Sequence, residues 1–540
     1  MAQERDNLCY AEHSRKITEL ARLHIVDSSR METLINPAKR PPARPESKPI
    51  RSLLKFAAGT TLVNVMTAAS ALVRGKLAAI LLGTAGVGII GQVDSFYRGL
   101  VQVCILSTGA GVIRCVAELK ATGDEAGIRR AFWSITLFSL ALSALATAVV
   151  LFSSKNLSTL VLGDAGYAMF LSVVAFGLPL QAVSDIVIGM LVGLRDLRGQ
   201  VRLTAAYSGA GVILYGLLIF RYGLPGAVYS SLAIAVATCL FSVFSVRKLQ
   251  GVNLWPPSVR RYFDLRLLRV ILAIGFTGGV MAITERAILV VFRAVLVRRF
   301  SLEANGLYQV VYSISQLTIA MAFGFVSTYV IPTLSGAQSP ERIRIEFSAA
   351  LRLALLIATG ISATTIIYGR LIILATYSSA FLGAIPLVRF QAVGDFFRAL
   401  MLLLSGTILA VYGWRPWFAI GMSFYVSYTV LFFLLLPIFG FPAISIAYLV
   451  SYCASYCLSL FLFPRYTTMS FPVHHVPLLI RSLVLLLFGS VLAYFTTPRT
   501  TYVIGTGALL LWTRFALSGS EYRHAWTYLR SQAGAFAGGD

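Results

Sequence analysis

Long apolar runs recur along the chain from Leu53 onward, each about as long as a membrane-spanning helix. A hydrocarbon core about 30 Å thick is crossed by roughly 20 helical residues. The pattern therefore predicts an all-α polytopic membrane protein with about 14 transmembrane helices. We place these helices at residues 53–82, 87–113, 130–152, 168–193, 203–220, 224–246, 267–297, 304–331, 348–368, 384–411, 416–436, 441–463, 478–495 and 501–517.

Residues 1–50 have a different character. The stretch from Asn36 to Pro49 is basic and rich in proline, and it has too little apolar surface to offset the entropy of ordering. We expect a disordered basic cytoplasmic tail. No apolar run precedes Leu53, so we expect no cleavable signal peptide.

The basic residues alternate between the two sides that these helices define. With the N-terminus inside, the cytoplasmic segments contain 33 of the 46 Lys and Arg residues, whereas the external segments contain six. Because cytoplasmic loops carry an excess of Lys and Arg, we expect both termini in the cytoplasm. The external segments are all short, so no catalytic domain fits within them.

Composition supports the same class and narrows the partners. Hydrophobic residues make up 57% of the chain and charged residues 13%, where a soluble domain carries about 25% charged residues. The excess of 46 basic over 22 acidic residues then fits loops that face anionic membrane lipids, and we expect no nucleic acid partner. The six cysteines are scattered without metal-ligand spacing, so no metal or other cofactor is expected.

The chain also contains a weak internal repeat. The segment Leu180-Gln-Ala-Val-Ser-Asp185 matches Phe390-Gln-Ala-Val-Gly-Asp395. In a second, weaker match at a similar offset along the chain, which we call the second echo, Lys76 corresponds to Arg293 and Gln92-Val93 corresponds to Gln309-Val310. Together the echoes pair the first predicted helix with the seventh, the second with the eighth, and the fourth with the tenth.

This pairing predicts two pseudo-symmetric six-helix lobes. The N-lobe covers residues 51–250 and the C-lobe covers residues 251–464. An extra helical hairpin and a cytoplasmic tail follow in residues 465–540. Six helices return the chain to the same side, so the lobes are related by an axis along the membrane normal, and substrate sites in such transporters lie between the repeats.

Some charged residues fall inside the predicted helices. Each costs on the order of 2.5–3.5 kcal/mol at a helix centre, so these groups should face the protein interior or a wet cavity. The embedded cations are Arg74, Lys76, Arg98, Arg286, Arg293, Arg389 and Arg398, and the embedded anions are Asp94, Asp185, Glu285 and Asp395.

Two interpretations of these charges remain open. Asp94 and Arg98 are four residues apart, and Asp395 and Arg398 are three apart, so each pair can form a local ion pair. Arg286 and Arg293 share one helix face without an acid on it, and the embedded groups sum to a charge of +3. Such a cationic cavity suits an anionic headgroup, because arginine matches phosphate geometry.

We therefore assign two sets of site residues and no catalytic residue. The expected substrate-binding residues are Arg74, Lys76, Arg98, Arg286, Arg293 and Arg398. The expected residues for conformational switching or ion coupling are Asp94, Asp185 and Asp395, and the matching positions of the last two in the repeat motivate this role.

Four segments resemble a known family. Ser52-Leu-Leu-Lys55, the stretch from Arg74 to Gln92, Gly189-Met-Leu-Val-Gly-Leu-Arg195, and the stretch from Gln391 to Arg398 resemble Wzx-type O-antigen and common-antigen flippases. These flippases belong to the multidrug/oligosaccharidyl-lipid/polysaccharide exporter superfamily. The resemblance covers residues 51–464, and the long N-terminal tail and the hairpin after Tyr466 depart from the family pattern.

The resemblance implies two six-helix lobes that rock in the bacterial inner membrane. It implies movement of an undecaprenyl-pyrophosphate-linked oligosaccharide to the outer leaflet, for O-antigen or exopolysaccharide synthesis. The implied partners are the lipid-linked anionic oligosaccharide, membrane lipids and polysaccharide polymerase machinery.

Two alternatives were weighed against this function. An ion-coupled drug exporter of the same superfamily would prefer an anionic cavity, whereas the embedded charge here is positive. A polytopic polysaccharide-synthesis enzyme would need a sizeable loop with reactive groups, and neither such a loop nor an Asp-x-Asp motif or a phosphate-binding glycine loop is present. The sequence thus favours a transporter over an enzyme.

Overall fold

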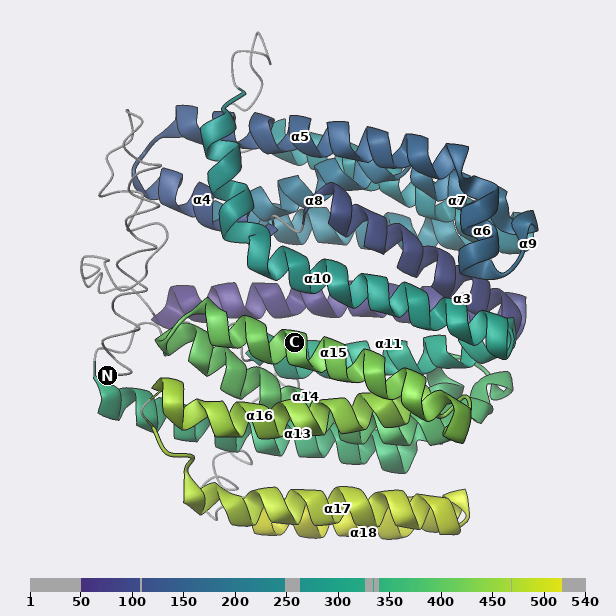
Figure 1. The fold of residues 1–540 in the computed structure, drawn as a ribbon, viewed down its shortest axis with the longest axis vertical. Helices are drawn as coiled ribbons and strands as arrows, with labels where there is room; N and C mark the ends of the chain where they lie inside the picture. The colour runs from purple at the N-terminus through teal and green to yellow at the C-terminus, as the bar shows by residue number, and fades with distance from the viewer. Residues whose placement is uncertain are drawn as a thin grey trace, which may run out of the picture. The chain divides into compact units, whose positions relative to one another are not determined.

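The computed structural model describes residues 50–106, 109–247, 263–325, 334, 339–467 and 469–516. Residues 57–540 form one compact unit and residues 1–56 another. Every regular element in the described residues is a helix (Figure 1), which confirms the predicted all-α class. The predicted tail, apart from Ile50, lies outside the described residues.

The helices follow the chain in this order: α3 (Ile50–Cys104), α4 (Gly109–Ala121), α5 (Glu125–Phe152), α6 (Ser154–Leu162), η2 (Ala165–Tyr167), α7 (Ala168–Ala175), α8 (Leu178–Gly193), α9 (Leu197–Arg247), α10 (Leu265–Arg299), α11 (Leu302–Phe325), α13 (Pro340–Thr376), η5 (Ser379–Ala384), α14 (Ile385–Val411), α15 (Trp414–Phe439), α16 (Ala443–Thr467), η6 (Val473–His475), α17 (Val476–Phe495) and α18 (Pro498–Ala516).

Two of these elements are interrupted by a glycine with an unusual backbone. Gly83 in α3 has φ 65° and ψ −165°, and Gly223 in α9 has φ 61° and ψ −132°. Glycine adopts positive φ without the steric cost that a Cβ atom imposes. The sequence predicts helix boundaries at both places, and the structure has the interruptions there.

The membrane-spanning character is confirmed, but the number of spans is not. In the described part of the chain, nine helices are long and apolar enough to cross a membrane. The count rises to ten if the segment 165–175 and α8, which meet at a bend of 42°, form one broken span. The interrupted helices α3 and α9 each enter this count once, so the total of about 14 stays a prediction.

Two predicted helices are each divided in the structure. The predicted helix 87–113 is split, because α3 ends at Cys104 and α4 begins at Gly109. The predicted helix 168–193 breaks between α7 and α8, directly before Pro179, which lies in the first turn of α8. Proline lacks the N–H that a helix interior needs and restricts the residue before it, so it begins a new helix here.

Helix α10 packs against both groups of helices. Leu268 and Ile271, in its first half, lie in a core with α4, α5 and α8, whereas Phe292 and Leu296 lie in the core of the C-terminal helices. Its start is fixed to α5 because the amide of Asp264 donates to Ser134 Oγ at 2.7 Å. Figure 1 shows a bend between the two halves. The division into two lobes at residue 250 stays a prediction, and α10 is shared between the groups.

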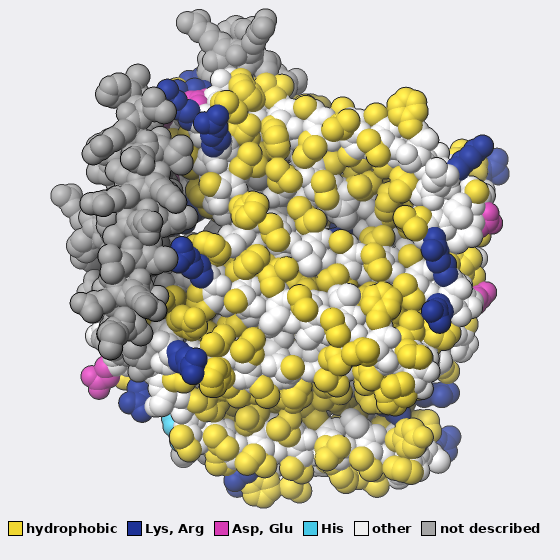
Figure 2. All heavy atoms as spheres, viewed as in Figure 1, with side chains coloured by type: hydrophobic (Ala, Val, Ile, Leu, Met, Phe, Trp, Pro, Cys, Tyr) yellow, Lys and Arg dark blue, Asp and Glu magenta, His cyan; other side chains and the backbone are white. Residues whose placement is uncertain are grey.

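The surface in Figure 2 has a wide hydrophobic middle, with Lys and Arg side chains gathered mainly toward its left and right sides, where most helices end in Figure 1. This distribution is expected where lipid chains cover the middle and headgroups meet the ends. The predicted C-terminal hairpin is present as α17 and α18, which pack on α13 (Figure 1). Gly505 permits this approach, since a Cβ there would lie 2.9 Å from Ile367.

Candidate functional site

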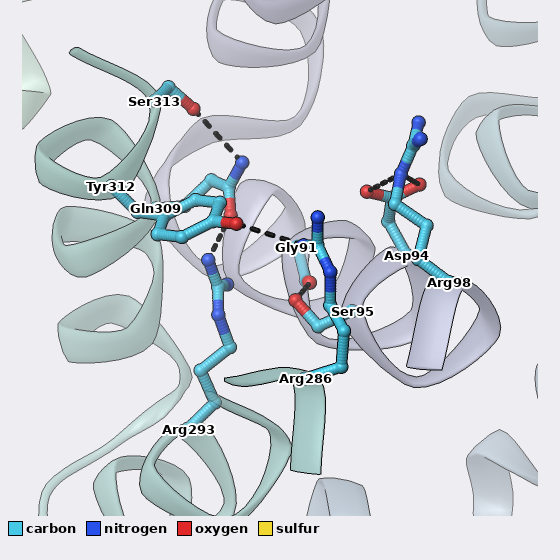
Figure 3. Close-up of polar contacts among 9 residues, drawn as sticks. All are labelled: Gly91, Asp94, Ser95, Arg98, Arg286, Arg293, Gln309, Tyr312 and Ser313. Carbon is cyan, nitrogen blue, oxygen red and sulfur yellow. Dashed lines mark hydrogen bonds and ion pairs between the residues drawn. The ribbon is translucent and has the colours of Figure 1, made fainter. Parts of the chain in front are cut away.

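A charged pair lies in the second half of α3. Arg98 Nε donates to Asp94 Oδ1 at 3.0 Å and Oδ2 at 2.8 Å (Figure 3). The side chains are 55% and 46% exposed, although α3 is long and apolar enough to cross a membrane. Because charges in a membrane protein face protein or water rather than lipid, this combination indicates an internal opening. The predicted ion pair between these two residues is confirmed.

Three other half-buried charges lie within electrostatic reach of this pair, and together with it they define what we term the polar opening. They come from different helices: Arg74 from α3, Asp185 from α8 and Arg286 from α10. Arg398 of α14 lies instead beside Tyr448 and Tyr452 of α16. Three of the six expected substrate-binding cations, Arg98 included, therefore lie at the polar opening, and so do two of the three expected acids.

Three arginines gather around one acid in this opening. Arg74, Arg98 and Arg286 all interact electrostatically with Asp94. We call this set the arginine cluster. Its three cations exceed Asp94 by two charges, and they exceed Asp94 and the nearby Asp185 together by one. Guanidinium groups also present several N–H donors in a plane. The cluster is therefore suited to an anion with several oxygen acceptors.

Arg286 is held by a tyrosine of α11. Its Nη1 atom donates to the Oη atom of Tyr312 at 2.9 Å (Figure 3). Tyr312 is half-buried, and its ring also lies 5.3 Å from the guanidinium carbon of Arg293. One tyrosine thus contacts both arginines that the sequence places on the same face of α10.

Arg293 differs from Arg286 because it is completely buried. Its Nη2 atom donates to Gln309 Oε1, and its guanidinium also lies 5.4 Å from the Tyr308 ring centroid. Its Nε and Nη1 atoms have no hydrogen-bond partner within the described part of the chain. A Cβ on Gly91 would lie 2.6 Å from Nη1, so this glycine makes room for the guanidinium. In this structure Arg293 does not reach the polar opening.

Lys76 has a local task at the end of a helix. Its Nζ atom donates to the carbonyl oxygen of Leu374 at 2.7 Å and to that of Tyr377. These carbonyls lie at the C-terminal end of α13, where helical carbonyls lack helical partners and carry partial negative charge. The ammonium group therefore caps α13, and the predicted grouping of Lys76 with the substrate-binding arginines has no contact to support it.

Asp395 is 3% exposed and bound by hydroxyl groups. Its Oδ1 atom accepts hydrogen bonds from Ser315 Oγ at 2.6 Å and from Tyr448 Oη at 2.7 Å. Arg398 Nη1 donates to the same Tyr448 Oη at 3.1 Å. Among the described side chains, Asp395 and Arg398 form no direct ion pair, so the predicted local pair is wrong. Tyr448 links the two because α16 places its hydroxyl between them.

The helices meet backbone to backbone near the bend of α3. A Cβ on Gly88 would lie 2.1 Å from the Leu302 carbonyl oxygen, and one on Gly306 would lie 2.0 Å from the Thr84 oxygen. Asn305 Nδ2 also donates to the Gly88 carbonyl at 2.7 Å. Small residues permit such close helix contacts in membranes. At this end of the helices, α3 and α11 are therefore in direct contact.

Sequence reasoning did not identify the polar partners of the charged residues. Tyr312 and Tyr448 are two of 24 tyrosines in the chain, and nothing in their local sequence marks them. Gln309 belongs to the second echo of the repeat, which is the one signal that could have singled it out.

Comparison with known proteins places the chain in a family. Residues 99–386 match the sequence profile of a family described as Polysaccharide biosynthesis protein. The chain is similar to the Lipid III flippases of Escherichia coli (strain K12) and Shigella flexneri. Each is 23% identical over 404 residues, which cover 74% of this chain and 95% of the relative.

Solved structures show the same fold. An inward-facing MATE family transporter of the MOP superfamily superposes with a TM-score of 0.64 at 16% identity, over 75% of this chain and 96% of that chain. A MOP superfamily transporter from Pyrococcus furiosus, described as having a binding pocket of reverse polarity, gives 0.60 at 15% identity, over 77% and 96%. The chain therefore belongs to the polysaccharide biosynthesis protein family, as its resemblance to Wzx-type flippases implied, and has the fold of MOP superfamily transporters.

Proposed function

We propose that the protein is a flippase that moves an undecaprenyl-pyrophosphate-linked oligosaccharide across the bacterial cytoplasmic (inner) membrane. The observation that carries this proposal is the arginine cluster, in which Arg98 is paired with Asp94 and Arg74 and Arg286 lie within electrostatic reach of it, all in membrane-spanning helices. Family membership supports it, and so do the relatives named Lipid III flippase. The product would feed synthesis of a surface polysaccharide such as O-antigen, with polymerase machinery as a further partner.

The charge balance of the cluster fits a pyrophosphate. Embedded cations without matching anions are costly in a membrane, so the excess of positive charge is stabilised when an anionic ligand binds. Arg98 and Arg286 each keep N–H donors beyond their described bonds to Asp94 and Tyr312. A pyrophosphate offers several acceptor oxygens at the spacing of a guanidinium fork.

Transport would proceed by alternating access between two states. The close contact of Gly88 with α11 marks the end of the helices that we assign as closed, and the fold resembles both inward-facing and outward-facing MATE transporters. With both termini in the cytoplasm, as the basic loops favour, the closed end is the external one. The polar opening then receives the headgroup from the inner leaflet, without any catalytic step.

The drug-exporter alternative is supported by fold likeness at superfamily level alone. A cationic drug would be repelled by the excess positive charge of the arginine cluster. No observation favours an enzyme over a transporter.

Arg286→Ala tests the proposed function. One hydrogen bond to a charged group contributes about 1.5–3 kcal/mol, which is roughly a ten- to hundredfold change in affinity. We expect a loss of that size in the affinity of the purified protein in nanodiscs for undecaprenyl pyrophosphate, and loss of glycan export in cells.

Arg370→Ala is the matched control, because Arg370 is an exposed arginine of α13 away from the cluster. It should bind and export like the wild type at equal protein level. Normal binding by Arg286→Ala would contradict the proposed role of the cluster. Failure of the wild-type protein to bind the lipid would contradict the function itself.

A further inference from the structure

A second set of polar side chains lies among the C-terminal helices. It comprises Glu285 of α10, Arg398 of α14, Tyr425 of α15 and Tyr452 of α16, and we call it the Glu285 group. Tyr425 Oη donates to Glu285 Oε2 at 3.4 Å, and the Arg398 guanidinium lies 5.5 Å from the Tyr452 ring centroid. Glu285 interacts electrostatically with Arg398, although the two form no ion pair within the described side chains.

The two charged members retain much unused hydrogen-bonding capacity. Arg398 has five N–H donors, and its described hydrogen bond is the one to Tyr448. Glu285 can accept about four hydrogen bonds, and its described bond is the long one from Tyr425. Polar groups away from water are costly when their partners are missing. A ligand with both hydrogen-bond donors and acceptors would satisfy the unused hydrogen-bonding capacity of Arg398 and Glu285.

Aromatic rings frame these polar groups. Tyr452 stacks on Phe424 with ring centroids 3.8 Å apart, and Tyr425 meets Phe424 edge to face at 5.3 Å. Tyr425 itself is half-buried. Sugar rings combine apolar C–H faces, which pack on aromatic rings, with hydroxyls that both donate and accept hydrogen bonds. The Glu285 group offers the complement of each.

The placement on α10 puts this group beside the arginine cluster. Glu285 and Arg286 are neighbours in sequence and point about 100° apart around the helix. Arg286 is directed toward Tyr312 of α11, whereas Glu285 is directed toward Tyr425 of α15. The cluster has an excess of positive charge and suits the pyrophosphate. The Glu285 group contains one anion and one cation, so it has no net charge and suits an uncharged sugar.

We propose that Glu285, Arg398 and Tyr425 form a carbohydrate subsite that binds hydroxyls of the sugar residues next to the pyrophosphate. This inference rests on the proposed flippase function, and it assigns the headgroup to two neighbouring subsites. The arginine cluster holds any undecaprenyl pyrophosphate, and the carbohydrate subsite distinguishes the glycosylated lipid from the bare one.

The test compares two ligands on the full chain in nanodiscs. The ligands are undecaprenyl pyrophosphate and the same lipid carrying an oligosaccharide. We expect the wild type to bind the glycosylated lipid more tightly. Tyr425→Phe and Glu285→Gln should each reduce that preference about tenfold, as expected when one hydrogen bond of about 1.4 kcal/mol is lost, and leave affinity for the bare lipid unchanged.

Matched controls separate the subsite from general effects. Tyr494→Phe alters an exposed tyrosine of α17, and Glu303→Gln alters an exposed acid at the start of α11. Both should retain the preference of the wild type. Arg286→Ala should weaken both ligands together. Unchanged thermal midpoints of the variants in nanodiscs would show that they remain folded, and Arg398→Lys provides a second variant if one of them does not.

Three results have different meanings. If Tyr425→Phe and Glu285→Gln weaken both ligands equally, or neither, the carbohydrate subsite is wrong while the flippase proposal stands. If Glu285→Gln changes only a dependence on Na⁺ or pH, Glu285 is an ion site and the subsite is likewise wrong. If the wild type binds neither lipid, the proposed function itself fails.

Discussion

The two copies of the Gln-Ala-Val-x-Asp segment have nearly the same sequence but different surroundings. In α8, Gln181 Nε2 donates to Asp185 Oδ1 at 2.8 Å, and Asp185 lies half-buried at the polar opening. In α14, the corresponding Gln391 donates instead to Ser315 Oγ at 3.4 Å, and Asp395 is buried beneath Ser315 and Tyr448.

The difference comes from helices that are distant in the chain. Ser315 belongs to α11 and Tyr448 to α16, and both donate to Asp395. For Asp185 the described hydrogen bond comes from its own helix. A repeated segment thus places an acid at a matching position in each half, while the neighbouring helices decide whether that acid is accessible. We propose that Asp185 takes part in switching or ion coupling and that Asp395 stabilises the C-terminal helices.

Gly306→Val should have the largest effect on export. It tests whether Asp185 and Asp395 respond differently when the contact between α3 and α11 is opened. The new side chain cannot fit against the Thr84 carbonyl, which would lie 2.0 Å from the Cβ. It should therefore force α3 and α11 apart, abolish glycan export and hold this end open. Asp395 should keep its partners, because Ser315 and Tyr448 lie on helices that pack directly against its own helix α14.

Labelling of a single cysteine at Gln102, one turn from Arg98, by a membrane-impermeant thiol reagent reports the state. The background must lack the native cysteines, several of which lie in described helices. Gly507→Val is the matched control, since a Cβ there meets nothing within 4 Å. Normal export by Gly306→Val would show that the close contact is not required.

Asp395→Ala should have the largest effect on stability. A small effect would contradict the proposal that Asp395, unlike Asp185, stabilises the C-terminal helices. It leaves the hydroxyls of Ser315 and Tyr448 without their acceptor in a buried site and removes a negative charge near Arg398. We expect the free energy of unfolding to fall by about 3 kcal/mol, measured by denaturant or thermal unfolding in detergent.

Tyr448→Phe should lower the free energy of unfolding less than Asp395→Ala does. It removes one hydroxyl but keeps the carboxylate and its bond from Ser315, so we expect a loss of about 1 kcal/mol. Equal losses for Tyr448→Phe and Asp395→Ala would mean that the tyrosine, and not the acid, organises this part of the core.

Asp185→Asn should have the smallest effect on stability. It tests most directly whether Asp185 differs from Asp395 by acting in the switch between states. Asparagine keeps an oxygen that accepts from Gln181, so the free energy of unfolding should change by less than about 0.5 kcal/mol. Removal of the charge at the polar opening should nonetheless shift the balance between states, seen as altered labelling of the cysteine at position 102. An unchanged labelling pattern together with normal export would remove Asp185 from the switching residues.

The sequence by itself determined the features that depend on local spacing. Apolar runs of sufficient length fixed the all-α membrane class and the approximate helix positions, because each span must match the bilayer. Helical periodicity placed Asp94 within reach of Arg98, and it placed Arg286 and Arg293 on one common face of their helix. These relations hold within one helix, whatever it packs against.

The tertiary structure decided which of the embedded charges are available. Lys76 caps α13, nearly 300 residues away in the chain, while Arg293 is enclosed by α11 beside Gly91 and Asp395 is covered by α11 and α16. A charge in a helix predicts the need for a partner, but the identity of that partner depends on how distant helices pack. The sequence therefore showed where the charges are, and only the packing showed that Arg74, Arg98 and Arg286 meet at one opening.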